Sequence, residues 1–170
     1  MLLEQQIESK KSSIKKDEFA ILKKGLSYSE KKVKDIMTHK SNVFFLEQDS
    51  IITRQKLEQI KNKGRSRIPV FNKTHNKVVG ILYAKDLVNI DPDKKLKIKS
   101  IMRKKVQVIK DETRLDQVLN LFKKNKIHIF IVKKKFKITG IVTLENVLEE
   151  IVGEISDEFD LTRELQRVQK

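Results

Sequence analysis

Two polar residues and their apolar neighbours have the chemistry to hold a phosphate and a flat apolar ring. Thr143 precedes a helical pattern, and the free N–H groups and dipole at a helix N-terminus favour phosphate. The guanidinium of Arg67 can fork onto phosphate oxygens, and Ile68 and Pro69 provide an apolar wall for a base. Simpler interpretations stay open, because Thr143 would cap its helix in any case and Arg67 could be an ordinary surface residue of a strand.

The other candidates for chemistry are weak. His39, His75 and His128 lack metal-ligand spacing, and His128 lies in an apolar run, which predicts a core or interface position. The acidic run from Glu145 to Asp160 either binds Mg²⁺ loosely or forms the solvated face of a capped helix. There is no Walker-type loop, no recognisable Ser-His-Asp pattern and no paired catalytic carboxylates, so we predict no enzyme and no resident metal.

Two copies of one unit position these residues. The stretch Gly140–Ile155 runs from a strand end through Thr143 into a helix, and a shorter version begins at Gly80, 60 residues earlier. The first unit is predicted as strand Asn42–Leu46, a helix capped by Asp49 and Ser50 and ending at Gly64, strands Arg67–Phe71 and Val78–Leu82, and a short helix Ala84–Asn89. The second is predicted as strand Val106–Ile109, a helix capped by Thr113, strands Ile127–Val132 and Lys137–Val142, and a helix Thr143–Val152.

The fold class is therefore predicted as α/β (α+β), with two strand–helix–strand–strand–helix repeats packed pseudo-symmetrically. Each repeat has about 60 residues, which is marginal for independent folding, so the two should share a core. We expect a linker helix within residues 1–32, repeat 1 at 33–92, repeat 2 at 93–152, and an acidic segment with a polar tail at 153–170. Pro69 lacks an N–H, so it should lie at a sheet edge or a bulge.

The net charge of +15 suggests anionic partners, but its distribution argues against specific nucleic-acid recognition. Only 7 of the 38 basic residues are Arg, the residue that base readout and phosphate forks favour. A solvated lysine-rich surface and attraction to an anionic membrane face remain as interpretations. The chain has no Cys, which excludes disulfides and thiolate metal sites. It has no apolar run near the ~20 residues of a spanning helix, so the fragment is expected to be soluble.

The motifs resemble a known family. Asp35-Ile-Met-Thr, Ser66-Arg-Ile-Pro-Val-Phe and Gly80-Ile-Leu-x-x-Lys-Asp-Leu look like a CBS motif, and Ser100-Ile-Met-Arg with Gly140-Ile-Val-Thr-Leu-Glu-Asn looks like a second one. The pair resembles a Bateman module. The longer ending, through Glu-Glu-Ile-Val-Gly-Glu-Ile-x-Asp-Glu-Phe-Asp, is similar to the CorC/HlyC/TlyC hemolysin-like family, which is linked to magnesium and cobalt efflux.

The resemblance implies a site for ATP or AMP, perhaps with Mg²⁺, and no obligatory cofactor. Carried over residue by residue, that site falls on Thr38, Arg67, Ile68, Pro69, Thr143 and Asn146. Asn146 replaces the family's usual Asp and offers the ribose one acceptor oxygen, which predicts weaker ribose binding. A possible second cleft falls on Tyr83, Asp86 and Arg103; Tyr83 replaces a small hydroxyl residue there, and Asp86 either contacts ribose or only favours the helix dipole.

The resemblance also implies a function and partners. We expect a cytoplasmic regulatory module, on the inner face of a membrane, that senses adenine nucleotide for an attached transmembrane cation-transport domain. We further expect a homodimer through the CBS repeats and no specific nucleic-acid partner. The alternative is a ligand-free dimerisation scaffold with degenerate clefts, which Asn146 and Tyr83 favour. The lysine-rich turn after Val132 departs from the family's acidic, Gly-containing turn, and the resemblance gives no reason for it.

Overall fold

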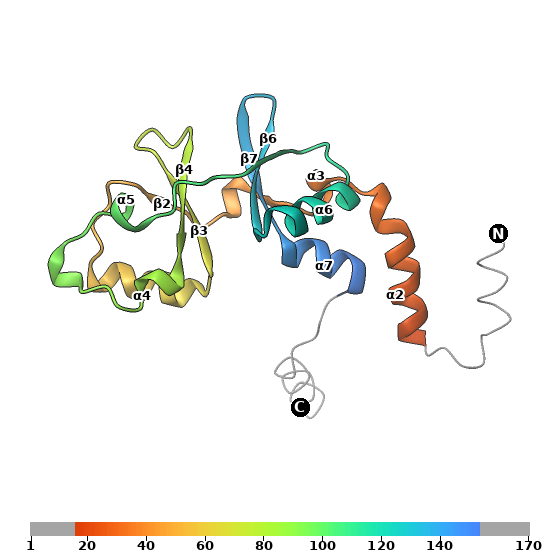
Figure 1. The fold of residues 1–170 in the computed structure, drawn as a ribbon, viewed down its shortest axis with the longest axis horizontal. Helices are drawn as coiled ribbons and strands as arrows, with labels where there is room; N and C mark the ends of the chain where they lie inside the picture. The colour runs from red at the N-terminus through yellow and green to blue at the C-terminus, as the bar shows by residue number, and fades with distance from the viewer. Residues whose placement is uncertain (1–15, 154–170) are drawn as a thin grey trace, which may run out of the picture.

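The computed structural model describes residues 16–153 and contains two α/β bodies side by side, preceded by a helix (Figure 1). The first half of the chain forms α2 (Lys16–Ser27), η1 (Tyr28–Glu30), α3 (Val33–Ile36), β1 (Thr38–His39), η2 (Lys40–Asn42), β2 (Leu46–Glu47), α4 (Arg54–Lys63), β3 (Arg67–Phe71), β4 (Val78–Tyr83) and η3 (Ala84–Leu87). The second half forms η4 (Pro92–Lys94), α5 (Ile98–Ile101), β5 (Val108–Lys110), α6 (Leu115–Asn125), β6 (Ile129–Lys134), β7 (Lys137–Thr143) and α7 (Leu144–Val152). The predicted class, two strand–helix–strand–strand–helix repeats behind a linker helix, is confirmed, although the first repeat ends in a 3₁₀ helix.

The two repeats exchange the short segments with which they begin. The three-stranded sheet has the order β2-β3-β4, and the four-stranded sheet has the order β1-β7-β6-β5. Strand β1 thus lies near the start of repeat 1 but pairs with β7 of repeat 2. Reciprocally, Arg103 forms a bridge with Ile81 on β4 of repeat 1. Each repeat therefore completes the sheet of the other, which gives the pair its pseudo-symmetry.

The helices beside these segments are exchanged as well. The Val33 N–H donates to the Thr113 carbonyl at 2.9 Å, so α3 lies against repeat 2. The Ile98 N–H donates to the Ser50 carbonyl at 3.0 Å, so α5 lies against repeat 1. Val33 is fully buried in the core of repeat 2, and Ile98 is fully buried in the core of repeat 1.

The glycines that open each repeat's final strand–helix unit make these crossings possible. A Cβ on Gly140 would collide with the carbonyl oxygen of Thr38 on β1. A Cβ on Gly80 would come within 2.6 Å of the Met102 sulfur and 3.0 Å of the Arg103 carbonyl oxygen. Gly140 is thus needed for the close approach of a crossing backbone, and Gly80 leaves room chiefly for the side chain of Met102.

A third apolar cluster joins the two bodies. It consists of buried side chains from β3 and β4 on one side and from β6 on the other: Phe71, Val78, Ile81, Ile129 and Ile131. Its burial supports the expectation that two halves, each marginal alone, share a core.

Several local predictions differ from the structure. Helix α4 is capped by the Thr53 hydroxyl, which accepts from the Lys56 N–H, and not by Asp49 or Ser50. The chain before Thr53 is instead held extended by the exchanged segment, since the Ile52 N–H donates to the Leu96 carbonyl. The residue at the N-cap of α6 is Arg114, one position after the predicted Thr113. The Gly64 C-cap of α4 is as predicted, with φ +59°.

Pro69 lies in the central strand of its sheet, yet no hydrogen bond is lost there. It faces Ile81, whose N–H and carbonyl bond to Arg103 and not to Pro69. The short β2 pairs with β3 only from Val70 onward, so the Pro69 nitrogen meets no strand on that side. Pro69 therefore does not lie in an edge strand, as predicted, but at a point where its own strand has no neighbour on the side of its nitrogen.

Within residues 16–153, no helix is long and apolar enough to cross a membrane. Helix α2 matches the predicted linker helix and contacts α7. Most of the predicted acidic segment and tail, from residue 154 onward, lies outside the described residues.

Candidate functional site

A cleft of about 390 Å³ opens between the two repeats and collects five of the six predicted nucleotide-site residues. The five are Thr38, Arg67, Pro69, Thr143 and Asn146. They come from four elements: β3 lies in one sheet, and the paired strands β1 and β7 lie in the other, with α7 directly following β7. The volume lies within the range of small-molecule sites, about 300–1,000 Å³.

Ile68 is the exception, and its predicted part in the apolar wall is wrong for its side chain. Successive side chains of a strand point to opposite faces, so Ile68 faces away from its neighbours Arg67 and Pro69. Its side chain is fully buried in the core of repeat 1 and does not line the cleft. Pro69 alone supplies the predicted wall from this strand.

Thr143 and Asn146 bind each other in a capping box at the start of α7. The Asn146 N–H donates to the Thr143 hydroxyl at 3.2 Å, and the Asn146 side-chain oxygen accepts from the Thr143 N–H at 3.0 Å. The Thr143 hydroxyl also donates to this oxygen, again at 3.0 Å. The capping role of Thr143 is therefore present. The only acceptor oxygen of Asn146 is occupied, which leaves its NH₂ donors for the cleft.

Charges of both signs line the cleft. Arg65 and Arg67 lie on the β3 side, whereas Glu145 and Glu149 lie on α7. A polyanion should therefore place its phosphates on the arginine side, and the glutamates would repel it unless a cation lay between them. Such an arrangement suits a phosphate chain that carries a divalent cation.

Arg67 has a donor without a partner. Its Nε is buried and forms no hydrogen bond within the described part of the chain. Leaving a buried donor unmet costs about 1–3 kcal/mol, so a ligand that lets Arg67 shift toward an acceptor would recover free energy. The guanidinium carbon lies 5.5 Å from the centre of the Tyr83 ring, so Arg67 also borders the second predicted cleft.

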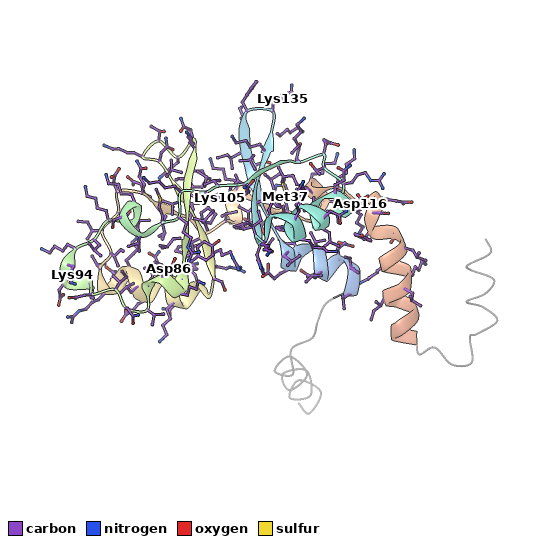
Figure 2. The ribbon with its side chains drawn as sticks, in the orientation of Figure 1. Met37, Asp86, Lys94, Lys105, Asp116 and Lys135 are labelled. Atoms are coloured by element: carbon purple, nitrogen blue, oxygen red, sulfur yellow. The ribbon has the colours of Figure 1, made fainter. Side chains whose placement is uncertain are left out.

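Of the three residues predicted for the second cleft, Arg103 contacts both of the others. The Arg103 guanidinium donates to both oxygens of Asp86, with Nη2–O distances of 3.0 and 3.1 Å. The same guanidinium carbon lies 4.0 Å from the centre of the Tyr83 ring. Asp86, labelled in Figure 2, thus has both carboxylate oxygens bonded to Arg103. The groups that would hold ribose or phosphate are satisfied without a ligand here.

The main cleft is also lined by residues that the sequence did not assign to the nucleotide site. They are Asn42, Val43, Phe44, Gly64, Arg65, Ser66, His128, Ile129, Ile141, Glu145 and Glu149. His128 is exposed in a bend before β6, so its predicted core or interface position in a strand is wrong. The internal repeat could have pointed to His128. In the structure, the Ala84 N–H donates to the Ser66 carbonyl, and the Leu144 N–H donates to the His128 carbonyl in the same way. Ser66 and His128 therefore occupy equivalent positions in the two repeats.

Metal ligands do not gather in the part of the chain that the structure describes. There, no group of three or more His, Asp or Glu side chains is placed to hold a metal ion. Glu145 and Glu149 lie one helical turn apart, so they would need oxygens from a ligand to complete a coordination shell.

Comparison with known proteins identifies the repeats. The family model for the CBS domain matches residues 33–93 and again residues 98–153. The chain is 36% identical over 152 residues to Protein MAM3 of Saccharomyces cerevisiae, covering 86% of this chain and 22% of that protein. It is 32% identical over 160 residues to Metal transporter cnnm-1 of Caenorhabditis elegans, covering 85% and 20%. The chain thus spans about a fifth of the length of these relatives, and the matches indicate no enzyme family.

Solved structures agree. The CBS domain of a bacterial CNNM/CorC family Mg²⁺ transporter has a TM-score of 0.80 and 29% identity, covering 92% of this chain and 94% of that one. A structure of such a domain in complex with ATP has a TM-score of 0.72 and 29% identity, covering 79% and 96%. The predicted resemblance to the CBS domains of CorC-type proteins is confirmed. Because the two matches to the family model cover well over half of the residues, the chain belongs to the CBS-domain family and carries a tandem pair of these domains.

Proposed function

We propose that this CBS pair is a regulatory module that binds an adenine nucleotide, ATP or AMP, in the cleft between its repeats. The observation that carries the proposal is the convergence of Thr38, Arg67, Pro69, Thr143 and Asn146 on one cleft. These residues were selected from motifs far apart in the sequence, and four elements bring them together. The related domain solved with ATP supports the same ligand class.

The chemistry of the cleft suggests how the nucleotide lies. Arg65 and Arg67 would take the phosphates, since guanidinium groups fork onto phosphate oxygens. Pro69 and Phe44 offer apolar surface for the adenine, and Asn146 lies on α7 where a ribose would be met. A Mg²⁺ carried by ATP would face Glu145 and Glu149 and relieve their repulsion from the phosphates.

We further propose that the module serves a membrane protein that transports Mg²⁺ or a similar cation, on the cytoplasmic side of the membrane. Two similarities support this: the relative described as a metal transporter and the CBS domain of a Mg²⁺ transporter. Helix α2 would then connect the CBS pair to a transmembrane domain. Nucleotide occupancy would change how the two repeats sit together and so act on α2 through α7, which it contacts.

Thermal unfolding with and without nucleotide tests the binding step. A ligand that binds only the folded state stabilises it by RT ln(1 + [L]/Kd), about 2.7 kcal/mol at a hundred times Kd. We expect ATP or AMP at millimolar concentration to raise the Tm, and Arg67→Gln to remove most of that rise. Arg54→Gln is the matched control, because Arg54 is an exposed arginine on α4 outside the cleft. No rise with any nucleotide, with or without Mg²⁺, would reject the proposal.

A second candidate function is a ligand-free dimerisation scaffold. It is favoured by the predicted second site, where Arg103 bonds to Asp86 and lies over the Tyr83 ring. Under this alternative, light scattering after size exclusion would show a dimer whose stability does not respond to nucleotide. A dimer that is also stabilised by nucleotide would fit the first proposal.

A further inference from the structure

The turn between β6 and β7 presents an aromatic side chain that the described protein leaves uncovered. Phe136 is 96% exposed, more than any other large apolar residue in the described part of the chain. Lys133, Lys134 and Lys135 precede it and Lys137 follows it. Figure 2 shows Lys135 at the tip of this hairpin, which projects away from both bodies. A bare aromatic ring inside a cluster of four lysines is an amphipathic tip.

The strands below this tip are paired and buried. Lys134 pairs with Lys137, and Ile131 and Val132, in the strand below, are almost completely buried. Lys135 has φ +54°, a left-handed conformation that glycine or asparagine adopts more easily. The turn thus uses a lysine where backbone conformation alone would favour glycine.

The surroundings of the hairpin are basic over a wider area. The β3–β4 turn, residues 72–77, projects from the same side of the molecule (Figure 1) and carries Lys73 and Lys77. The connector at residues 104–107 runs from β4, where Arg103 pairs with Ile81, to β6, where the Gln107 carbonyl accepts from Ile131. The turn, the connector and residues 133–137 contain no Asp or Glu. One carboxylate, Asp111, lies at the base of the hairpin, where its N–H donates to the Lys133 carbonyl and its side chain is buried. Glu145, Glu149 and Glu150 lie on α7.

We propose that the β6–β7 hairpin tip, Lys133–Lys137, is an anchor for the surface of an anionic lipid bilayer. The ring of Phe136 would enter the boundary between the headgroups and the acyl chains, where apolar side chains are buried. The flanking lysines would keep their ammonium groups among the lipid phosphates while their methylene stems follow the ring. The inference does not rest on nucleotide binding, because these residues lie outside the cleft.

Lipid fits this tip better than nucleic acid does. Single-stranded nucleic acid is bound along grooves in which aromatic rings alternate with basic side chains, and here one ring stands at the apex of a narrow projection. Specific duplex recognition also favours arginine, and residues 133–137 contain none.

Vesicle binding of the full 170-residue chain tests the anchor. The probes are phosphatidylcholine vesicles with about a quarter phosphatidylserine, and vesicles of phosphatidylcholine alone. We expect sedimentation with the anionic vesicles only, weakened about fivefold for each lysine removed in Lys134→Gln/Lys135→Gln. Phe136→Ser should weaken binding by a similar total factor. The Phe136→Trp variant adds a direct readout, since the chain has no other Trp: its emission should shift to the blue on anionic vesicles and be quenched by brominated acyl chains.

The chain offers matched controls. Lys94→Gln/Lys95→Gln removes an adjacent pair of lysines at the far end of the molecule (Figure 2), and Lys95 also has a left-handed backbone, with φ +49°. Val88→Ser removes an apolar side chain that is 79% exposed and lies away from the hairpin. Both should bind vesicles like the unaltered chain.

Three results would overturn the anchor. Equal losses in the hairpin and control variants would show that only the overall charge of +15 matters. Unshifted, unquenched indole emission from vesicle-bound Phe136→Trp protein would show that the tip does not enter the bilayer. Loss of a dimer in Phe136→Ser, with vesicle binding unchanged, would assign the tip to a protein contact instead.

Discussion

At the scale of single residues, the hydrogen bonds of Asn146 bear on the proposed ribose contact. Its side-chain oxygen accepts from both the N–H and the hydroxyl of Thr143, so only the NH₂ group remains for a ligand. An aspartate could keep one oxygen in the capping box and offer the other to the ribose hydroxyls, as an acceptor with a full charge. The predicted weakness of ribose binding thus gains a structural reason.

We therefore predict that Asn146→Asp binds adenine nucleotide about tenfold more tightly, since a hydrogen bond to a charged group contributes roughly 1.5–3 kcal/mol. Calorimetric titration with AMP and ATP measures the change. Asn120→Asp, an exposed site on α6, introduces the same charge outside the cleft and should leave affinity unchanged. Equal or weaker binding by Asn146→Asp would mean that this position does not contact the ribose.

The two crossing glycines give a second prediction at this scale. Gly140→Ala brings a methyl group onto the carbonyl oxygen of Thr38, which is backbone and cannot move aside cheaply. Gly80→Ala chiefly meets the Met102 side chain, which can change rotamer. We expect Gly140→Ala to cost about 3 kcal/mol or more of unfolding free energy and Gly80→Ala about 1–2 kcal/mol. Urea denaturation measures both, and equal costs would contradict the explanation from the crossings.

At the scale of elements, ion pairs fasten each exchanged segment to its host repeat. Glu112 accepts from Lys32 at 2.6 Å and from Lys34 at 2.9 Å, joining the start of α3 to repeat 2. The hydrogen bond from Lys32, followed by that from Lys34, lowers the pKa of Glu112 from 4.5 to about 2. Asp49 and Lys99 form the equivalent pair for α5, at 2.8 Å, and this pair lowers the pKa of Asp49.

The depressed pKa of Glu112 makes part of the stability pH-dependent. The folded protein holds the carboxylate ionised more strongly than the unfolded chain does, so the contribution is fully present above pH 4.5 and is lost as the pH falls toward 2. The difference in unfolding free energy between the unaltered chain and Glu112→Gln should therefore shrink over that range. Denaturation at several pH values measures it, with Glu58→Gln on an exposed face of α4 as the control. A constant difference would show that the ion pairs do not stabilise the fold.

The sequence predicted elements well where local signals were sufficient. Strand β3 has the predicted bounds, Gly64 ends α4 as its conformational freedom suggests, and Thr143 caps α7 through its own hydroxyl. The predicted helix cap was wrong where a segment far along the chain supplied the hydrogen bond in place of a local one. Ser50 was expected to cap a helix, but its carbonyl accepts from Ile98, 48 residues further along the chain. No periodicity within a window could have shown that pairing.

The candidate site shows the same division. The repeat itself pointed to Thr143, whereas Thr38, Arg67 and Asn146 entered through the family resemblance, with a phosphate-binding role for Arg67 that its guanidinium makes plausible. His128 was missed because the apolar run around it predicted a strand from Ile127, while β6 begins at Ile129. A shift of two residues moved His128 from a presumed core into the cleft.

At the scale of the whole molecule, the exchange means that each packed body is built from a different set of residues than the sequence repeat it mainly contains. The family matches begin at residues 33 and 98, yet Val33 is buried in the body of repeat 2 and Ile98 in the body of repeat 1. Each body therefore obtains part of its core and one edge of its sheet from the segment that begins the other repeat. Neither repeat, cut at its sequence boundaries, contains a complete core.

This arrangement predicts how fragments of the chain fold. A fragment of residues 43–104 contains the sheet β2-β3-β4 together with the exchanged helix α5, whereas residues 33–93 include α3 and β1, which belong to the other body, and lack Ile98. The two fragments have nearly the same length, so chain length does not separate them. We expect residues 43–104 to unfold cooperatively at the higher urea concentration, and residues 33–93 to show little cooperative structure by circular dichroism. Ile98→Ala in the first fragment should remove most of its advantage, because truncating a buried Ile costs about 2–5 kcal/mol. If residues 33–93 proved the more stable fragment, the exchange would contribute little to the fold, and each repeat would carry its own core.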